Sequence, residues 1–295
     1  MLVGADVSTA GGLPSGIVRG EAMRAEVIQI RCLSSRAWHG PRPSPEVMEA
    51  YRAAQEASKV VSATFCHAPY LINLATGDEE LAGKSYENLV DNLVVASSIG
   101  SSGVVLHVGS HLGRGTDAVL EQLGRTVVAA LDDAAKALGA PSCDLLLENT
   151  AGGGGTIGRS FEELGAVLDS AAGDERLGVC LDTQHLFASG VAYNNPGEAE
   201  AVIAEIAATI GLARLRCIHL NDSKVEFASN RDRHENLGAG LIGKAALGLL
   251  CSHPAIAEVP VILEVPGDGS GPRKEDVAAA KKMIAAGRRR RATAA

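Results

Sequence analysis

Residues 177–185 read LGVCLDTQH, an apolar run of strand length that ends on Asp182 and is followed by His185. Taken alone, this pattern fits a carboxylate that caps the next turn and a histidine that satisfies a backbone carbonyl. A functional role for the pair is the alternative. The pattern of the remaining chain decides between the two interpretations.

Similar apolar, β-branched runs recur along the whole chain. They cover residues 2–7, 26–31, 61–67, 103–108, 144–149, 214–220 and 259–265. Segments with helical spacing alternate with them, over residues 44–58, 79–99, 117–138, 197–211 and 274–287. A strand followed by a helix, repeated eight times, is the pattern of a (β/α)8 TIM barrel, an α/β fold. Near-continuous apolar strands also fit a parallel sheet that is covered on its outer face.

The composition limits the class of protein. A chain of 295 residues that is 46% hydrophobic can form two ordinary domains or one large barrel. No linker divides it, so we predict a single barrel domain over residues 1–287 and a disordered basic tail over 288–295. The tetraglycine at 152–155 lacks the Gly-Lys-Ser/Thr ending of a phosphate loop and is predicted to be a flexible loop. For the tail, a contact with a phosphate backbone is the alternative to a solvated end.

Location and partners are constrained by the same composition. The chain has no uncharged apolar run of about 18 residues, which argues against a membrane span. Its first residues, MLVGADVSTAGG, do not resemble a signal peptide. The six dispersed cysteines are expected to be reduced core residues, so we predict a cytoplasmic protein. A net charge of −8 argues against a generally basic surface that coats nucleic acid.

Six successive predicted strands end at or near a side chain that can bind a metal. These side chains are His67, His107, Glu148, Asp182, His219 and Glu264. His185 follows Asp182, and Asp232 and His234 follow the seventh strand at Asp-x-His spacing. Active sites of TIM barrels lie at the C-terminal ends of the strands. We therefore expect these nine side chains to converge, because chance placement of capping residues would give only one or two such coincidences.

Imidazole and carboxylate groups together are ligands of zinc, or of manganese and iron at mixed nitrogen and oxygen sites. Five histidines and four carboxylates exceed the needs of one tetrahedral ion and suit two or three ions. Clustered ions act as Lewis acids, activate water at neutral pH and stabilise both oxygens in phosphoryl transfer. The alternative is a polar rim without metal, in which four converging carboxylates would repel one another.

Seven segments carry more specific motifs. They are HAPYLINL (67–74), HVGSHLG (107–113), LLENTAGGG (146–154), VCLDTQH (179–185), IHLNDSK (218–224), RDRHENLG (231–238) and VILE (261–264). By these motifs the sequence resembles the endonuclease IV family, the zinc-dependent apurinic/apyrimidinic endonucleases of base excision repair. The resemblance extends from GADVSTAGG, which begins at Gly4, to the segment VILEVP near the end of the chain.

The resemblance implies a centre of three zinc ions, with Mn²⁺ or Fe²⁺ as alternatives at some sites. It implies one ion bound by His67, His107 and Glu148, a second bound by Glu148, Asp182, His219 and Glu264, and a third bound by His185, Asp232 and His234. Glu148 and Glu264 are the carboxylates expected to act in catalysis. All nine positions hold the residue type that the family pattern requires.

The reaction implied is hydrolysis of the phosphodiester 5′ to an abasic site in duplex DNA, which leaves a 3′-hydroxyl and a 5′-deoxyribose phosphate. DNA with blocked 3′ ends is a second expected substrate, and a monomer is the expected state. Family members flip the abasic nucleotide out of the stack, which costs least where the base is already missing. Arg36, Tyr70 and Leu71 are the residues expected to fill the gap in the DNA.

Four positions depart from the family pattern without removing a ligand. Asp6 replaces a usual histidine, Gln184 replaces a small residue or cysteine, Ala239 replaces a frequent glutamate, and Val108 replaces the usual proline. Asp6 and Gln184 are expected to lie in or next to the layer around the ligands, where metal affinity is tuned. These departures bear on rate, metal preference and substrate more than on the fold.

Two other functions remain open. A sugar isomerase or epimerase on a related barrel would bind one ion through Glu148, Asp182, His219 and Glu264. Such an enzyme does not usually need the histidines at 67 and 107 or the Asp-x-His loop, so these positions favour the nuclease. The other alternative is a metal-stabilised protein that binds damaged DNA without cutting it.

Overall fold

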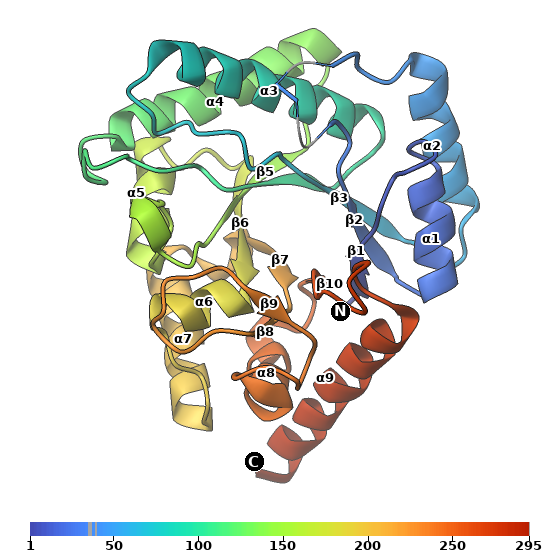
Figure 1. Ribbon diagram of the computed structural model, residues 1–295, viewed down its shortest axis with the longest axis vertical. Coiled ribbons are helices and arrows are strands. Elements are labelled where there is room, and N and C mark those ends of the chain that lie inside the picture. The colour runs from blue at the N-terminus through green and yellow to red at the C-terminus, as the bar shows by residue number, and fades with distance from the viewer. Residues whose placement is uncertain (35–36, 39, 295) are drawn as a thin grey trace.

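The computed structural model describes residues 1–34, 37–38 and 40–294. Eight parallel strands close into a barrel in the order β1, β10, β7, β6, β5, β4, β3, β2 (Figure 1). They span Val3–Asp6 (β1), Val27–Ile30 (β2), Ala63–His67 (β3), Gly103–Leu106 (β4), Asp144–Glu148 (β5), Leu177–Asp182 (β6), Leu215–His219 (β7) and Val261–Leu263 (β10). The predicted single-domain TIM barrel is confirmed.

Helices surround the barrel, with α3 and α4 on the opposite side from α8 and α9 (Figure 1). They span Ser15–Met23 (α1), Pro45–Ala57 (α2), Glu79–Ser98 (α3), Leu120–Leu138 (α4), Phe161–Ser170 (α5), Thr183–Ser189 (α6), Pro196–Thr209 (α7), Gly243–Cys251 (α8) and Lys274–Ala294 (α9). The five predicted helical segments are all present. Residues 222–223 (β8) and 234–235 (β9) form a small antiparallel pair outside the barrel. None of the helices in the described ranges is long and apolar enough to cross a membrane.

Local sequence explains where several helices begin. Pro45 and Pro196 occupy the first turns of α2 and α7, where a missing backbone N–H costs no hydrogen bond. The Asp78 side chain accepts a hydrogen bond from the backbone N–H of Leu81 and caps α3. Asp182 caps α6 in the same way, by accepting from the backbone N–H of His185 at 2.8 Å. The capping interpretation of Asp182 is therefore correct, and it does not exclude a second role.

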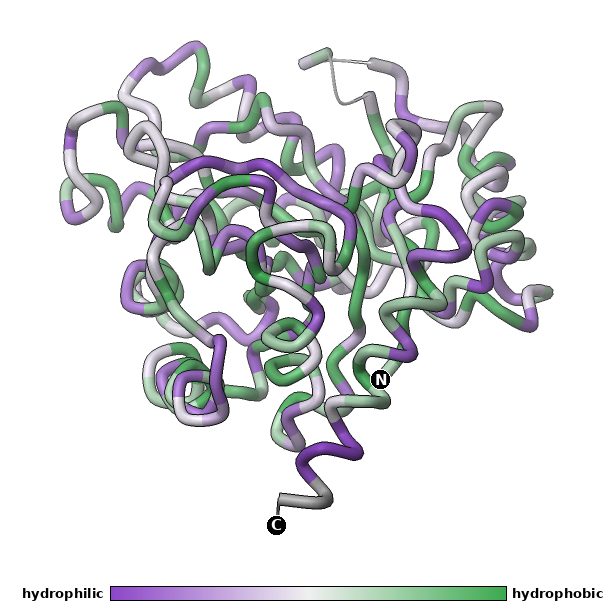
Figure 2. The backbone as a smooth tube through the Cα atoms, turned by 60° about the horizontal axis from the view of Figure 1, so that its bottom comes forward, coloured by the Kyte–Doolittle hydropathy of each residue, from purple (hydrophilic) through white to green (hydrophobic). Residues whose placement is uncertain are grey.

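The barrel interior is apolar below the C-terminal ends of the strands. One residue from each of seven strands forms this layer, namely Val27, Phe65, Val105, Leu146, Cys180, Cys217 and Ile262. A larger apolar cluster packs the helices against the outside of the strands. Figure 2 shows hydrophobic stretches alternating with hydrophilic ones along the backbone. Because successive side chains of a strand point to opposite faces, residues two positions further along each strand also point inward.

The structure differs from the disordered tail that the sequence predicts. Helix α9 continues to Ala294, and the Arg291 guanidinium donates to the Glu200 carboxylate at 2.7 Å and to the Leu249 carbonyl at 2.9 Å. Alanine and arginine favour helix, and extending an existing helix avoids the cost of nucleation. The arginine run is the hydrophilic segment next to the C-terminus in Figure 2.

Candidate metal centre

A polar layer lies two residues beyond the apolar layer of the barrel interior. Counting from that layer, its members are Gln29, His67, His107, Glu148, Asp182, His219 and Glu264, and Asp6 ends the remaining strand, β1. Most of these side chains are fully buried, and His107 is half-buried. The parallel strands therefore bring all six strand-end ligand candidates into one pocket.

Glu148 lies at the middle of the layer. One carboxylate oxygen, Oε2, is 3.2 Å from His67 Nε2 and 3.0 Å from His107 Nε2. The other oxygen, Oε1, is 2.8 Å from His219 Nδ1. A carboxylate that faces histidines from both of its oxygens is placed to bridge two ions.

The described residues form four groups that could each hold one ion, with ligand atoms within 4.8 Å of one another. One pairs His219 with Cys180 and Cys217 of the apolar layer, and the other three consist of histidines and carboxylates alone. In chain order of their first members, the first of these three groups is His67, His107 and Glu148, the second is Glu148, Asp182, His219 and Glu264, and the third is Asp182, His185 and His234. The first two groups have the membership that the resemblance implies. The third differs in that Asp182 stands where Asp232 was expected. Asp232 lies next to it, with carboxylate oxygens 3.3 Å from both His185 Nε2 and His234 Nε2.

The histidines are oriented as metal ligands require. The Nδ1 atoms of His67 and His185 contact the carbonyls of Ala68 and Asn149 at 2.7 and 2.9 Å, which leaves their Nε2 atoms toward the pocket. Among the described residues, the Nε2 atoms of His107, His185 and His234 are buried and make no well-aligned hydrogen bond, although each lies 3.0 to 3.3 Å from a carboxylate oxygen of Glu148 or Asp232. Buried imidazole nitrogens and carboxylate oxygens that face one another without aligned hydrogen bonds can all be satisfied by an ion between them, so this donor set fits divalent metal ions.

The electrostatics of the pocket also favour cations. Burial alone would raise the pKa of Glu148, but His107 and His219 outweigh burial and hold it well below its usual value. Burial opposes protonation of His185, yet the Asp182 and Asp232 carboxylates raise the pKa of His185 to about 10. In the absence of metal, protons on buried histidines thus balance the ionised carboxylates. Metal ions would take over this role.

The loop that carries Asp232 and His234 is held by two side chains. The Asp222 carboxylate accepts hydrogen bonds from the backbone N–H groups of Gly238, Ile242 and Gly243 at 2.7 to 3.2 Å. Gln184 is fully buried, and its Nε2 donates to the Arg231 carbonyl at 3.1 Å and to Ser223 Oγ at 3.3 Å. Gln184 therefore contacts the backbone one residue before Asp232, whereas a small residue could not reach it.

Of the three predicted DNA-contacting residues, Tyr70 lines the cleft beside the pocket, Leu71 follows it in the chain, and Arg36 lies outside the described residues. Tyr70 and Leu71 are exposed large hydrophobic side chains, with exposed fractions of 59% and 37%. The Tyr70 ring lies 5.4 Å from the His67 ring and 5.2 Å from the His107 ring, measured between centroids. A cleft of about 330 Å³ extends from Tyr70 past His107 and Asp232 toward the tetraglycine loop.

The tetraglycine loop has a steric reason for its glycines. A Cβ at Gly152 would lie 2.9 Å from the Arg159 and Asn230 side chains, and the backbone φ there is +85°. Residues Gly153–Gly155 form one turn of 3-10 helix, and a bridge joins Ser110 to Thr156. Close packing and a positive φ thus account for glycines in this loop.

Sequence reasoning missed Gln29, Arg31 and Asp222. Gln29 could have been found from the strand period, because it follows Val27 at the inward-facing spacing in the run EVIQIR. Asp6, which replaces the histidine usual in the family pattern, forms an ion pair with Arg31 at 3.2 Å. Arg31 also lies 4.0 Å from Glu264. Burial raises the pKa of Asp6 to about 6 against the opposing effect of Arg31. No sequence signal distinguished Asp222 from an ordinary loop carboxylate.

Comparisons with known proteins agree with this geometry. Residues 21–287 match the family described as xylose isomerase-like TIM barrel. The protein named "Probable endonuclease 4" of Oleidesulfovibrio alaskensis is 38% identical over 93% of this chain and 91% of its own length. That of Streptomyces coelicolor is 37% identical over 95% of this chain and 94% of its own length.

Solved structures show the same relationship. Endonuclease IV from Thermus thermophilus superposes with a TM-score of 0.81 at 34% identity, over 97% of this chain and 98% of the other. A D-tagatose 3-epimerase-like protein reaches a TM-score of 0.68 at 19% identity, over 95% of each chain, a likeness of fold alone. The chain therefore belongs to the endonuclease IV family of nucleases, within the xylose isomerase-like TIM barrels.

Proposed function

We propose that this enzyme hydrolyses the phosphodiester 5′ to an abasic site in duplex DNA and leaves a 3′-hydroxyl and a 5′-deoxyribose phosphate. The observation that carries the proposal is the convergence of nine metal-competent side chains in one pocket with Glu148 between the first two groups. Three zinc ions are the proposed complement, with Mn²⁺ or Fe²⁺ as alternatives at some positions. When bound, the ions would supply Lewis-acid activation of water and neutralise the charge of the scissile phosphate.

The chain's own residues would hold and orient these ions. His67, His107 and Glu148 would bind the first, and Glu148, Asp182, His219 and Glu264 the second. His185 and His234 would bind the third with Asp232, which lies 3.3 Å from both ring nitrogens. The Asp182 carboxylate also caps α6, which fixes its direction and that of His185. Glu148 and Glu264 remain the carboxylates proposed to face the reacting phosphate.

Substrate selection would rest on the rim of the pocket. Tyr70 and Leu71 are large exposed side chains, and the Tyr70 ring lies beside the His67 ring of the first metal group, so we propose that the two residues fill the space that a missing base leaves in the duplex. We propose Arg36 as a third contact. An abasic nucleotide is the easiest to extrude because it lacks stacking and pairing. DNA with blocked 3′ ends is the second substrate that we propose for the same pocket.

The pocket contains more potential metal ligands than a sugar isomerase or epimerase with one ion needs. His67, His107, His185 and His234 all face the pocket, while such an enzyme would use the second group alone. We therefore favour phosphodiester hydrolysis over sugar chemistry on this barrel. We propose that the protein is cytoplasmic and monomeric, and light scattering on the purified protein would test the monomeric state.

The test is incision of a duplex that carries one tetrahydrofuran abasic analogue, which a β-elimination lyase cannot cut. The assay is run with added zinc, and again after the protein has been stripped with a chelator. We expect a zinc-dependent cut 5′ to the lesion with a 3′-hydroxyl product. Absence of cutting by folded, metal-loaded protein would reject the proposal, and tight binding without cutting would identify a damage-binding protein instead.

A further inference from the structure

Gln29 occupies a position in the polar layer between two proposed metal ligands. Its side chain is fully buried at the end of β2. Its Nε2 donates to Glu264 Oε1 at 2.7 Å, and its Oε1 lies 2.8 Å from His219 Nε2. Both polar atoms of the amide are therefore used by two side chains on other strands, β7 and the end of β10.

The chemistry of the partners fixes the direction of both bonds. An ionised carboxylate only accepts hydrogen bonds, so the amide nitrogen must face Glu264. The amide oxygen then faces His219 and can only accept, so His219 must carry a proton on Nε2. The nitrogen of His219 that is left to bind an ion is Nδ1, which lies 2.8 Å from Glu148 Oε1 and 3.2 Å from Glu264 Oε2.

His219 is thus turned in the opposite sense to His67 and His185, and it would offer Nδ1 rather than Nε2 to an ion. His67 and His185 direct Nδ1 to backbone carbonyls and Nε2 to the pocket. His219 directs Nε2 away from the pocket, where the Gln29 amide provides the acceptor that a backbone carbonyl provides for the others. The ligand orientation at His219 therefore depends on a side chain, which a mutation can remove.

Glu264 is constrained from the same side. Its Oε1 atom accepts from Gln29 and lies 4.0 Å from the Arg31 guanidinium, which in turn is paired with Asp6 at 3.2 Å. Its Oε2 atom is the one that faces His219 Nδ1. With Oε1 held by Gln29 and Arg31, Oε2 is the oxygen left for an ion.

We propose that Gln29 is a positioning residue of the second metal group, which directs His219 Nδ1 and Glu264 Oε2 toward one ion. The inference rests on the metal centre of the proposed function. Partners of this kind around metal ligands typically contribute about 10- to 100-fold in metal affinity. An apolar side chain at position 29 would fill the space but leave His219 Nε2 and Glu264 Oε1 without these bonds.

The test compares zinc affinity and stoichiometry in Gln29→Met, Gln29→Asn and wild type, by titration against a chromogenic chelator. Methionine keeps the length of glutamine without its polar atoms, and asparagine keeps the amide but is too short to reach both partners. We expect one equivalent to bind about 10- to 100-fold more weakly in Gln29→Met, with a smaller loss in Gln29→Asn. The Co²⁺ absorption spectrum of Gln29→Met should change as well, because the coordination of that ion changes.

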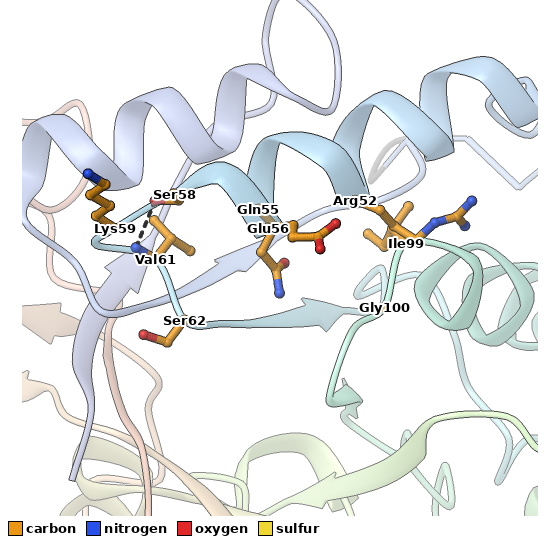
Figure 3. A pocket seen from close by; sticks show the side chains of 9 residues that line it. All are labelled: Arg52, Gln55, Glu56, Ser58, Lys59, Val61, Ser62, Ile99 and Gly100. Atoms are coloured by element: carbon orange, nitrogen blue, oxygen red, sulfur yellow. Dashed lines mark hydrogen bonds between the residues drawn. The ribbon is translucent and has the colours of Figure 1, made fainter.

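Gln55→Met is the matched control. The Gln55 side chain accepts a hydrogen bond from Thr64 Oγ1 at 2.7 Å, near the start of β3, whereas His67 ends that strand. Gln55 lines a hollow of about 410 Å³ at this end of the barrel. Figure 3 shows it there together with Glu56 and Ser62. Removing its amide should leave the affinity of every zinc equivalent unchanged.

The outcomes separate this inference from the proposed function. Unchanged zinc affinities in folded Gln29→Met and Gln29→Asn, or an equal loss in Gln55→Met, would overturn the positioning role. Failure of both Gln29 variants to fold in the presence of zinc would overturn it too, because a positioning role leaves the core intact. Wild-type protein that binds zinc without cutting abasic DNA would refute the function, while the affinity comparison would still decide on Gln29.

Discussion

The proposed ligands are held in two different ways. Glu148, Asp182 and His219 end barrel strands, are fully buried and are fixed by the hydrogen bonds between neighbouring strands. Asp232 lies in the loop between β8 and β9, His234 begins the two-residue strand β9, and the Asp232 side chain has an exposed fraction of 45%. The ligands of the first two metal groups are therefore positioned by the barrel strands, whereas the third group also depends on the contacts that hold the loop of Asp232.

The largest loss of incision activity is expected from a substitution of Glu148, the central ligand among those held by the barrel strands. Glu148→Gln removes the charge that faces His67, His107 and His219. We expect incision to fall by about a thousandfold or more, the scale of losing a group that stabilises charge in the transition state. Zinc titration should show loss at two equivalents rather than one, because Glu148 belongs to two groups. Loss of a single equivalent would show that Glu148 does not bridge.

A smaller loss of activity is expected from a substitution of Asp232, the proposed ligand in the loop between β8 and β9. Asp232→Asn keeps the shape of the side chain but removes the charge 3.3 Å from His185 and His234. We expect about a hundredfold weaker binding of one zinc equivalent, with the other equivalents unchanged, since the strands hold those ligands independently. Incision should fall less than in Glu148→Gln. Equal losses at all equivalents would show that the two parts are not independent.

A still smaller loss of zinc affinity is expected from a substitution that removes hydrogen bonds to this loop and leaves every proposed ligand in place. Gln184→Ala removes the hydrogen bonds to Arg231 and Ser223. We expect about tenfold weaker binding of the same equivalent that Asp232→Asn affects, measured by zinc titration. The Gln55→Met protein serves again as the control. An effect confined to the strand-held equivalents would contradict the role that we assign to Gln184.

As the pH rises, the stability of the metal-free protein should fall while its affinity for zinc should rise. In the metal-free protein the pKa of His185 is raised from 6.5 to about 10, against burial, by Asp182 and Asp232. The folded-state pKa exceeds the unfolded value, so this stabilisation is fully present below about pH 6.5 and is lost as the pH rises through about 10. Because an ion must displace this proton, zinc affinity should rise over the same window.

Two titrations would check this prediction. Thermal unfolding of chelator-treated protein should show a falling Tm over that window, and zinc competition experiments should show a rising affinity. The Asp232→Asn variant should flatten both slopes, because it removes one of the carboxylates that raise the pKa of His185. Zinc affinity that does not depend on pH would contradict the assignment of His185 as a ligand.

Many of the proposed ligands could be predicted from the sequence, because a residue's place at the end of a strand determines where it lies in a barrel. Parallel strands of a barrel end at the same face, so a polar residue after each apolar run must join the others. His67, Glu148 and Asp182 follow this rule directly. The period of the helices likewise located α3 and α4, since their apolar stripes face the strands.

The contacts of Gln29, Gln184 and Asp222 could not be predicted in the same way. Gln29 meets His219 and Glu264 across separations of 190 and 235 residues, and an amide in an apolar run has no local pattern that names such partners. Asp222 looks like an ordinary turn residue until the backbone of residues 238–243 is folded around it. The end of α9 also departs from the local signal, because Arg291 finds partners on α7 and α8.

The sequence by itself therefore determined the barrel, the strand-end ligand candidates and the family, all of which depend on periodicity and motifs between near neighbours in the chain. Only the tertiary structure decided which nitrogen of His219 faces the centre, which oxygen of Glu264 is left for an ion, and what holds the loop of Asp232. The physical reason is that these choices depend on hydrogen-bond partners that closure of the barrel brings together from distant strands.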